Sequence, residues 1–468
     1  MPDTPPHDAP DLRFGSPGAR WLLLTTVLGS GMALLDSTVV NVALPALTAD
    51  LGAGVIGLQW ILNGYLLTLS AFLLVGGSLG DRHGRRRIFS FGVILFTAAS
   101  LLCALAPNTG TLIAARALQG LGGALLVPGS LALIQSSFLP KERGKAVGLW
   151  SGMSGVAAAI GPLFGGWLVG SLGWRWVFLI NLPIGALVLL AARHVPERRA
   201  PKQEGGVDHL GALLAVLALG GICLALIDAG ATGSSLRVWA AAIVGVVSLM
   251  AFVVVERRAR APMLPMRLFR SRDFSVANVV TLLAYAALGG LMLFLVLYLQ
   301  VVAGFTPLQA GMALLPVSAL MLVLSPGAGA LTDRLGPRWV MAAGCTVAGA
   351  GTLLLSRLTP QLSVWRDLVP AVVLFALGLC FVATPVTVTV LSSVSSSHAG
   401  IASGINNAVA RTASLLAVAA LPLVSGLSRQ GMTFLPQAYP RAMVLCALLL
   451  FLSAGLSLAL SRRQRVPG

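Results

Sequence analysis

The chain has 468 residues, of which 57% are hydrophobic and only 10% carry a charge. Its mean hydropathy of +0.89 excludes a water-soluble globular protein and predicts an all-α protein that crosses the bilayer many times. A net charge of +17 would suggest a nucleic-acid partner in a soluble protein. We expect none here, because membrane topology explains where the Lys and Arg residues fall.

The chain begins with a polar, Pro-rich segment, 1–20, which is predicted to be a disordered cytoplasmic tail. Fourteen apolar stretches of membrane-spanning length follow. They are residues 21–45, 56–79, 88–106, 111–134, 146–169, 175–193, 209–228, 237–255, 274–300, 309–331, 339–358, 368–391, 400–426 and 440–460. Residues 461–468 are predicted to form a second cytoplasmic tail.

The loops predict the orientation of the chain. With the N-terminus inside, the cytoplasmic segments hold roughly four times as many Lys and Arg residues as the outer segments. The sequence therefore predicts a multi-pass protein of the cell membrane with both termini in the cytoplasm.

Two loops carry the same pattern, GSLGDRHGRRR at 77–87 and GALTDRLGPRW at 329–339. The repeat predicts two related six-helix bundles, at 21–193 and 274–460, with linkers and two extra spans at 194–273. In parallel repeats of this kind, the substrate site lies between the halves near the membrane midplane. The matching residues of the first loop are Gly77, Asp81, Arg82, Gly84 and Arg86, and those of the second include Asp333 and Arg334.

Asp36 lies deep in the first span, within LDSTVVNVALP (35–45). A charged carboxylate at that depth is costly, so it should face a water-filled cavity or a partner. A residue that takes up and releases a proton there indicates proton-coupled transport. Binding of a cationic substrate and a permanently paired structural carboxylate remain alternatives.

Arg116 is the expected partner of Asp36, because both lie at similar depth if the first and fourth spans are neighbours. Our hypothesis is that Arg116 stabilises the charged carboxylate in one conformation and releases it in another. A fixed buried ion pair is the alternative.

The fifth span carries Gly148, Gly152, Gly155, Pro162 and Gly166, which fall on one helix face. The candidate hinge is made of Gly155, Gly161, Pro162, Gly165 and Gly166. Small residues and a proline give a flat helix face with a local weakness, against which two halves could rock. Ordinary close packing of helices is the alternative.

Arg411 lies in the middle of the thirteenth span, on a polar face with Asn407. No acid lies at membrane depth in the second half of the chain. Arg411 either contacts carbonyl and Asn groups or binds an anionic or polar group of a substrate.

The chain resembles the major facilitator superfamily, and within it the fourteen-span drug/proton antiporters of the QacA/EmrB type. Five motifs, in order, carry the resemblance: LDSTVVNVALP (35–45), GSLGDRHGRRR (77–87), LIAARALQGLGGA (112–124), GVAAAIGPLFGG (155–166) and WRWVFLINLPIG (174–185). The resemblance implies export of small amphipathic organic compounds, such as drugs and antibiotics, in exchange for protons by alternating access. It also implies a cytoplasmic gating latch at 77–87 and 329–339 and an exporter motif in the fifth span.

Two further functions stay open. One is a dedicated exporter of a single metabolite or antibiotic, and the other is a membrane receptor or sensor that moves nothing. We expect no enzyme activity, no cofactor and no metal site, because no catalytic cluster, nucleotide motif or metal-ligand spacing is present. The expected partners are a small-molecule substrate, protons and the lipid bilayer, with the protein acting as a monomer.

Overall fold

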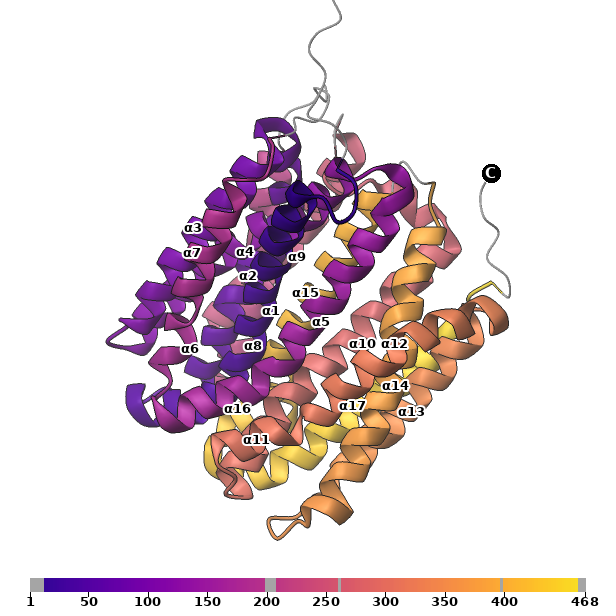
Figure 1. The fold of residues 1–468 in the computed structure, drawn as a ribbon. Helices are drawn as coiled ribbons and strands as arrows, with labels where there is room; N and C mark the ends of the chain where they lie inside the picture. Colours follow the sequence, from indigo (N-terminus) through magenta and orange to yellow (C-terminus); the bar gives the residue numbers. More distant parts are fainter. Residues whose placement is uncertain (1–11, 198–207, 260–261, 396–398, 462–468) are drawn as a thin grey trace, which may run out of the picture.

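The computed structural model describes residues 12–197, 208–259, 262–395 and 399–461, and within these residues the fold is entirely helical (Figure 1). Fourteen helices are long and apolar enough to cross a membrane, which confirms the predicted number of spans. Leu12 and Phe138 form an isolated backbone bridge.

The first bundle supplies spans one to six. The sixth span is made of two short helices, α6 and α7. The bounds are α1 Pro17–Leu51, α2 Val55–His83, α3 Arg85–Ala104, α4 Thr109–Ser137, α5 Pro140–Ser171, α6 Arg175–Leu179 and α7 Asn181–Ala192.

The second bundle supplies spans nine to fourteen. Its helices are α10 Arg272–Leu297, α11 Pro307–Ala313, α12 Leu315–Leu335, α13 Pro337–Leu355, α14 Val369–Ser392, α15 Ala399–Ser425 and α17 Leu435–Ser457. Short helical segments connect or extend them. These are η1 Met266–Arg270, η2 Tyr298–Val302, η3 Val364–Leu368, α16 Leu427–Gln430 and η5 Met432–Phe434.

The predicted N-terminal tail is partly ordered. Helix α1 begins at Pro17, and the Ser16 side chain caps it by accepting a hydrogen bond from the Ala19 amide. The Phe14 amide donates to a Glu142 carboxylate oxygen at 2.6 Å, so residues before the helix are held against α5. Residues 1–11 and 462–468, which make up the rest of the two predicted tails, lie outside the described residues.

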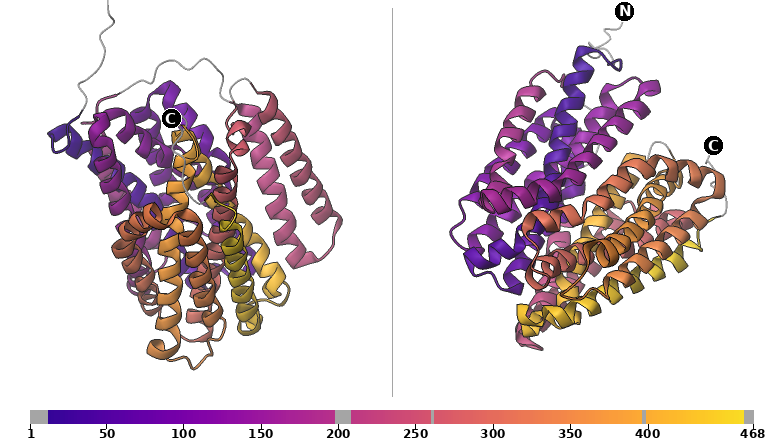
Figure 2. Two further views of the ribbon diagram at one scale, coloured as in Figure 1. Left: turned by 90° about the vertical axis from the view of Figure 1, so that its right-hand side faces the viewer. Right: turned by 60° about the horizontal axis from the view of Figure 1, so that its bottom comes forward.

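Helices α8 (His209–Thr232) and α9 (Leu236–Arg258) form a pair beside the two bundles, as the left view of Figure 2 shows. Gly221 and Gly245 let their backbones approach closely, since a Cβ at Gly221 would lie 2.8 Å from the Gly245 Cα. Helix α8 contacts α2 of the first bundle and α15 of the second, whereas α9 packs chiefly on α8. Span seven therefore bridges the two bundles.

The internal repeat is visible in the backbone. Gly84 separates α2 from α3 with φ = +100°, and Gly336, its counterpart in the sequence repeat, separates α12 from α13 with φ = +82°. Residues with a Cβ rarely adopt such positive φ angles, so glycine is required at both turns. In each bundle, a glycine with a positive φ thus ends the second span.

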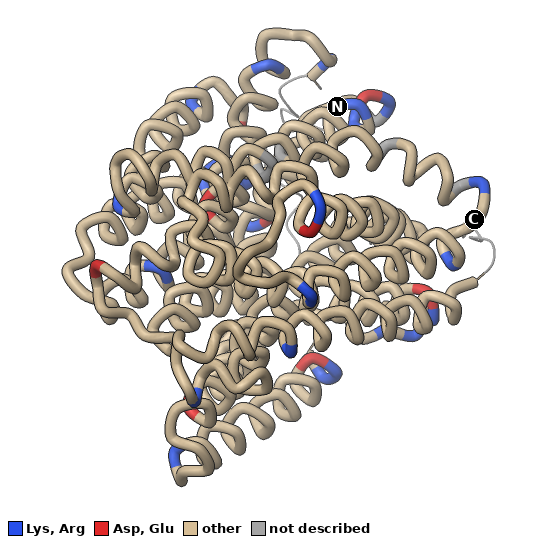
Figure 3. The backbone as a smooth tube through the Cα atoms, turned by 90° about the horizontal axis from the view of Figure 1, so that it is seen from below, with Lys and Arg blue, Asp and Glu red and all other residues tan. Residues whose placement is uncertain are grey.

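We name the two ends of the molecule by their residues. The terminal face holds Pro17, Gly84 and Gly336, and the distal face holds Leu51 and Ser171. Both described ends of the chain lie at the terminal face (Figure 1). Figure 3, a view from the distal side, shows how few charged residues the backbone carries.

The bundles contact each other closely in the distal half. Gly166 of α5 lies against the backbone of Pro307 and Leu308, and Gly311 of α11 lies in turn against Pro162. The two helices therefore cross backbone to backbone, which only glycine permits at these two positions.

Two glutamine side chains also join the bundles in the distal half. Gln59 of α2 donates to the carbonyls of Val418 (2.9 Å) and Ala419 (3.1 Å) in α15. Gln300 of η2 donates to the carbonyl of Val42 in α1 at 3.0 Å. The Val418 carbonyl lacks the usual helical donor four residues on, because residue 422 is a proline without an amide hydrogen.

The terminal half of α5 has no such neighbours. A Cβ added at Gly144, Gly148, Gly152 or Gly155 would meet no atom within 4 Å. Along α5 the two bundles therefore meet at the distal end and separate towards the terminal face, as the right view of Figure 2 shows. On the other side α15 stays in contact with the first bundle, because Gly404 faces Leu74 of α2, with 3.4 Å between its added Cβ and that side chain.

We predict that Gly84→Ala lowers the stability of the fold by about 1–3 kcal/mol, because alanine is strained at this φ. Its Cβ would also lie 2.6 Å from the Glu197 carboxylate. Thermal unfolding of the purified protein in detergent measures the change. Gly144→Ala is the matched control and should not lower the melting temperature; equal losses in both variants would contradict the explanation.

Candidate functional site

Asp36 lies near the middle of α1 and is 0% exposed. Its carboxylate faces the interior of the first bundle and is closed off there by side chains of neighbouring helices. An Arg116 guanidinium nitrogen in α4 lies 2.6 Å from one carboxylate oxygen, and Arg116 is itself only 1% exposed. Of the two environments expected for Asp36, the structure has the partner and not a water-filled cavity.

Three further polar side chains complete the site. The Gln119 amide donates to the second Asp36 oxygen at 2.8 Å, and the Asn181 amide donates to the same oxygen at 3.2 Å. Both amides also donate to the Ser100 hydroxyl, at 2.6 and 3.0 Å. Helices α1, α3, α4 and α7 each contribute to this cluster, which we call the buried carboxylate network.

Arg116 is held on several sides. It donates to the Gln119 side-chain oxygen at 2.6 Å and, at 3.4 Å, to the backbone carbonyl of Ile61 in α2. Its guanidinium carbon lies 4.3 Å from the centre of the Tyr65 ring and 5.8 Å from that of Phe178. These contacts offset the cost of removing two charges from water, which a bare ion pair would not repay.

Sequence reasoning identified Asp36 and Arg116 but missed Gln119, Asn181 and Ser100. Gln119 lies three residues after Arg116 and so shares its helix face. Asn181 belongs to the motif WRWVFLINLPIG. Both signals were present in the sequence. Ser100 carried none, because a serine within an apolar helix is common.

The network can hold the carboxyl group in either protonation state. The charged form accepts three hydrogen bonds from its neighbours. The Asn181 side-chain oxygen is buried and has no hydrogen-bond partner among the described residues. Rotation of that amide would present an acceptor to a protonated Asp36.

Among the described residues, the N-terminal latch residues bond within the first bundle and to the segment that directly follows α7. Asp81 forms an ion pair with Arg85 at 2.8 Å, and Arg86 lies 3.4 Å from the Glu197 carboxylate and donates to the Val195 carbonyl at 2.8 Å. Arg82 is exposed. Gly77 faces Pro128 of α4, the nearest atom to its added Cβ at 3.9 Å.

The C-terminal copy of the latch makes fewer polar contacts among the described residues. Arg334 is exposed at the end of α12, and the Asp333 side chain lies outside what the structure describes. Arg338 stacks on Trp339 at 5.2 Å. No hydrogen bond or ion pair links the two latch loops among the described residues.

The residues of the fifth-span motif divide between two neighbours. Gly161 and Gly165 face Thr38 and Val39 of α1, within the first bundle. Gly166 and Pro162 form the crossing with α11, and Gly155 faces open space. The motif residues therefore face two sides of the helix, with Gly161 and Gly165 packed inside the first bundle and Gly166 packed against the second.

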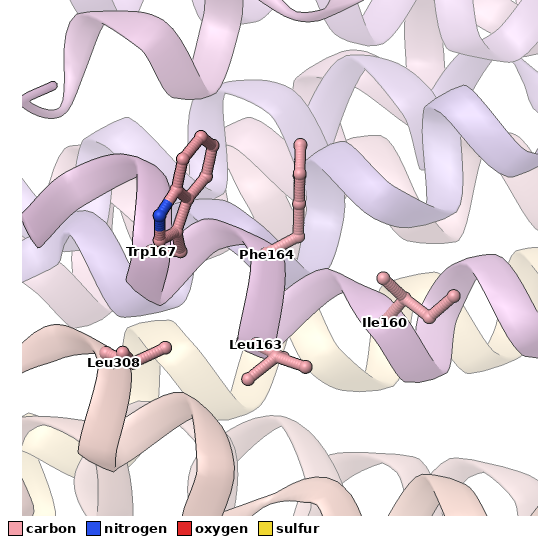
Figure 4. A pocket seen from close by; sticks show the side chains of 5 residues that line it. All are labelled: Ile160, Leu163, Phe164, Trp167 and Leu308. Carbon is pink, nitrogen blue, oxygen red and sulfur yellow. The ribbon is translucent and has the colours of Figure 1, made fainter. Parts of the chain in front are cut away.

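A groove of about 350 Å³ lies beside this crossing (Figure 4). It is lined by Ile160, Leu163, Phe164, Trp167 and Leu308, and its only polar side-chain atom is the Trp167 nitrogen. None of these five lining residues carries a titratable side chain.

Arg411 and Asn407 lie apart from the buried carboxylate network, in α15 of the second bundle. Arg411 is half-buried, and Asn407 is exposed and donates to the Ser403 carbonyl at 3.2 Å. The described residues contain no cluster of three or more His, Cys, Asp or Glu that could hold a metal ion.

Comparison with known proteins places the chain among membrane transporters. Residues 26–419 match the family model described as the Major Facilitator Superfamily. The chain is 38% identical over 412 residues to the puromycin resistance protein pur8 of Streptomyces alboniger, covering 87% of this chain and 82% of that protein. It is 34% identical over 456 residues to the methylenomycin A resistance protein of Bacillus subtilis, covering 95% and 96%.

A solved structure shares the fold. It is the crystal structure of a bacterial homologue of the human lysosomal transporter Spinster, in an inward-facing and unoccupied conformation, with a TM-score of 0.67 and 19% identity. The match covers 95% of this chain and 97% of that one. At this identity the likeness shows the fold alone.

We predict that Arg116→Ala costs roughly 3–5 kcal/mol of stability at neutral pH, because it leaves the buried Asp36 charge without its partner. Acidification should restore part of the loss, since protonation removes that charge. Thermal unfolding at pH 7.5 and pH 5 measures both effects.

Arg175→Ala is the control for this prediction, because its pair with Asp50 at 2.7 Å is about half exposed and should contribute little. A loss in Arg116→Ala that does not change with pH would show that packing, and not the charge of Asp36, dominates.

Proposed function

Because this chain belongs to the major facilitator superfamily, and is thus a multi-pass membrane transporter and not an enzyme, we propose that it exports small, mainly amphipathic organic compounds in exchange for protons. Antibiotics are the proposed substrates, since the two relatives above are resistance proteins. Each is named for a single antibiotic, which favours a dedicated exporter as the second candidate.

The proposed location is the cell membrane, with both termini in the cytoplasm and the protein acting as a monomer. The distribution of basic residues supports this orientation, because Lys and Arg gather on the cytoplasmic side of membrane proteins. Those described at the terminal face include Arg82, Arg87, Lys145, Arg257, Arg258 and Arg334.

The unequal contact between the bundles is the observation that carries this proposal. The bundles touch backbone to backbone at Gly166 and Gly311, whereas Gly148 faces open space in the terminal half of the same helix. In the proposed orientation, the junction beside α5 is open to the cytoplasm and closed to the outside, while α2 and α15 remain in contact at Leu74 and Gly404. Alternating access requires the reverse state as well, reached when the distal contacts separate and the terminal ends close.

The latch loops are the proposed contacts of that second state. They lie at corresponding ends of α2 and α12, next to the turns at Gly84 and Gly336. Arg334 is exposed in the present state and is free to find an acidic partner when the terminal ends approach. The distal crossing at Gly166 is the proposed place where the bundles rock.

The proposed proton step occurs at Asp36. The carboxylate takes up one proton and loses its charge attraction to Arg116, while Arg116 keeps its bonds to Gln119 and the Ile61 carbonyl. Because five helices supply these contacts, a change of charge here acts on the packing of the whole first bundle. Release of the proton restores the ion pair and the original packing.

We predict that Asp36→Asn abolishes transport driven by a pH gradient. The neutral amide fits the site but cannot exchange a proton. Efflux of ethidium, puromycin and methylenomycin A from sealed vesicles with an imposed gradient is the measurement. The wild type should transport at least one compound, and the variant should fall to the rate of empty vesicles.

Asp50→Asn is the matched control, since Asp50 belongs to the same helix but lies exposed at its distal end. It should keep the wild-type rate. Gradient-driven efflux that survives in Asp36→Asn would assign the coupling proton to another group.

We also predict that the terminal half of α5 is reached by solvent from the cytoplasmic side alone. Gly148→Cys should react with a membrane-impermeant maleimide in inside-out vesicles, and Ser171→Cys, at the exposed distal end of α5, in right-side-out vesicles. The five native cysteines are buried and give little background. The opposite labelling pattern would reverse the proposed orientation.

A further inference from the structure

Arg411 is a cation at mid-membrane depth that the proposed proton step does not use. It lies twelve residues after the start of α15, or ~18 Å along the helix axis, and about as far from its end. Helix α15 contacts α2 of the first bundle and α10 of the second, so the helix that carries Arg411 lies at the junction of the two bundles. A charge held there requires a counter-charge or strong hydrogen bonds.

The structure provides no such partner among its described residues. Arg411 makes no hydrogen bond and no ion pair with them, and its side chain is only half-buried. Ser414, one turn after Arg411, donates to the backbone carbonyl of Tyr285 at 3.3 Å, so Tyr285 of α10 lies beside this part of α15. The hydroxyls of Tyr285 and of Tyr65 in the first bundle interact electrostatically with Arg411. Both hydroxyls are neutral at physiological pH and leave the charge uncompensated.

The acids of the region are engaged elsewhere. Asp36 is paired with Arg116, whose guanidinium lies over the Tyr65 ring. In the second bundle, Asp273 accepts hydrogen bonds from Ser461 at the terminal end, and Asp367 accepts one from the Ser363 amide at the distal end. The described part of the membrane centre therefore holds two arginines and a single carboxylate.

We propose that Arg411 binds an anionic group of the exported compound, foremost a carboxylate, and that the preferred substrates are amphipathic organic acids. A guanidinium presents paired donors that match a carboxylate in geometry. Tyr285 and the exposed Asn407, one helical turn away, supply further polar contacts beside it. This inference rests on the proposed export function and names its substrate class.

Ligand binding tests the inference without requiring transport. The purified protein in detergent is titrated with benzoate, 2-naphthoate and 1-pyrenebutyrate and with the methyl ester of each acid, and the melting temperature gives the affinity. In the wild type, at least one acid should bind more tightly than its ester. In Arg411→Gln that acid should lose about tenfold in affinity, to the level of the ester.

Two further variants separate charge from folding. Arg411→Lys keeps the charge without the paired donors, so its affinity for the acid should lie between those of the wild type and Arg411→Gln. Arg429→Gln removes an exposed arginine near the distal face and should change nothing. If Arg411→Gln does not fold, the inference is tested by the affinity of Arg411→Lys for the acid and by the comparison of acid with ester in the wild type.

Two outcomes overturn the inference. One is that no acid binds the wild type more tightly than its ester, and the other is that the preference persists in Arg411→Gln. Either result leaves gradient-driven efflux untouched. Conversely, binding of acids without gradient-driven efflux would contradict the export function and keep Arg411 as an anion site.

Discussion

The ion pair between Asp36 and Arg116 is the constraint around which the first bundle is organised. Neither charge is tolerated alone in an apolar interior, so the surrounding helices must supply every remaining donor and acceptor. Gln119, Ser100 and Asn181 do so from three helices, and the Tyr65 ring covers the guanidinium. A bundle built on such a cluster responds as a unit to the charge at its centre.

The described residues of the second bundle form no matching charged cluster at its centre. A neutral contact lies there instead, in which the half-buried Asn406 amide donates to the side-chain oxygens of Asn278 and Thr281. The two halves therefore share a fold and the turns at Gly84 and Gly336, but they differ in the charged groups that they hold. One half carries a compensated charge pair, and the other presents the uncompensated Arg411 at their junction.

Hydropathy and loop motifs predicted the fold well, because the bilayer forces every span to be long, apolar and helical. The number of spans and the pairing of Gly84 with Gly336 follow from such patterns. The other neighbours of Asp36, beyond Arg116, could not be predicted in this way, since hydrophobicity does not tell which face of a helix turns towards which neighbour. Ser100 and the division of the fifth-span glycines between α1 and α11 depend on tertiary packing, which a single helix does not encode.

Pro422 in α15 explains one of the hydrogen bonds that join the bundles at the distal end. Because proline has no amide hydrogen, the Val418 carbonyl lacks its usual helical donor four residues on. The Gln59 amide of the first bundle donates a hydrogen bond to this carbonyl instead. In the proposed second state, where the bundles part at this end, that carbonyl would need water as its donor, because a buried acceptor without a donor is costly. Opening of the distal side would thus require hydration of this one peptide group, and exclusion of water from the contact favours the closed arrangement.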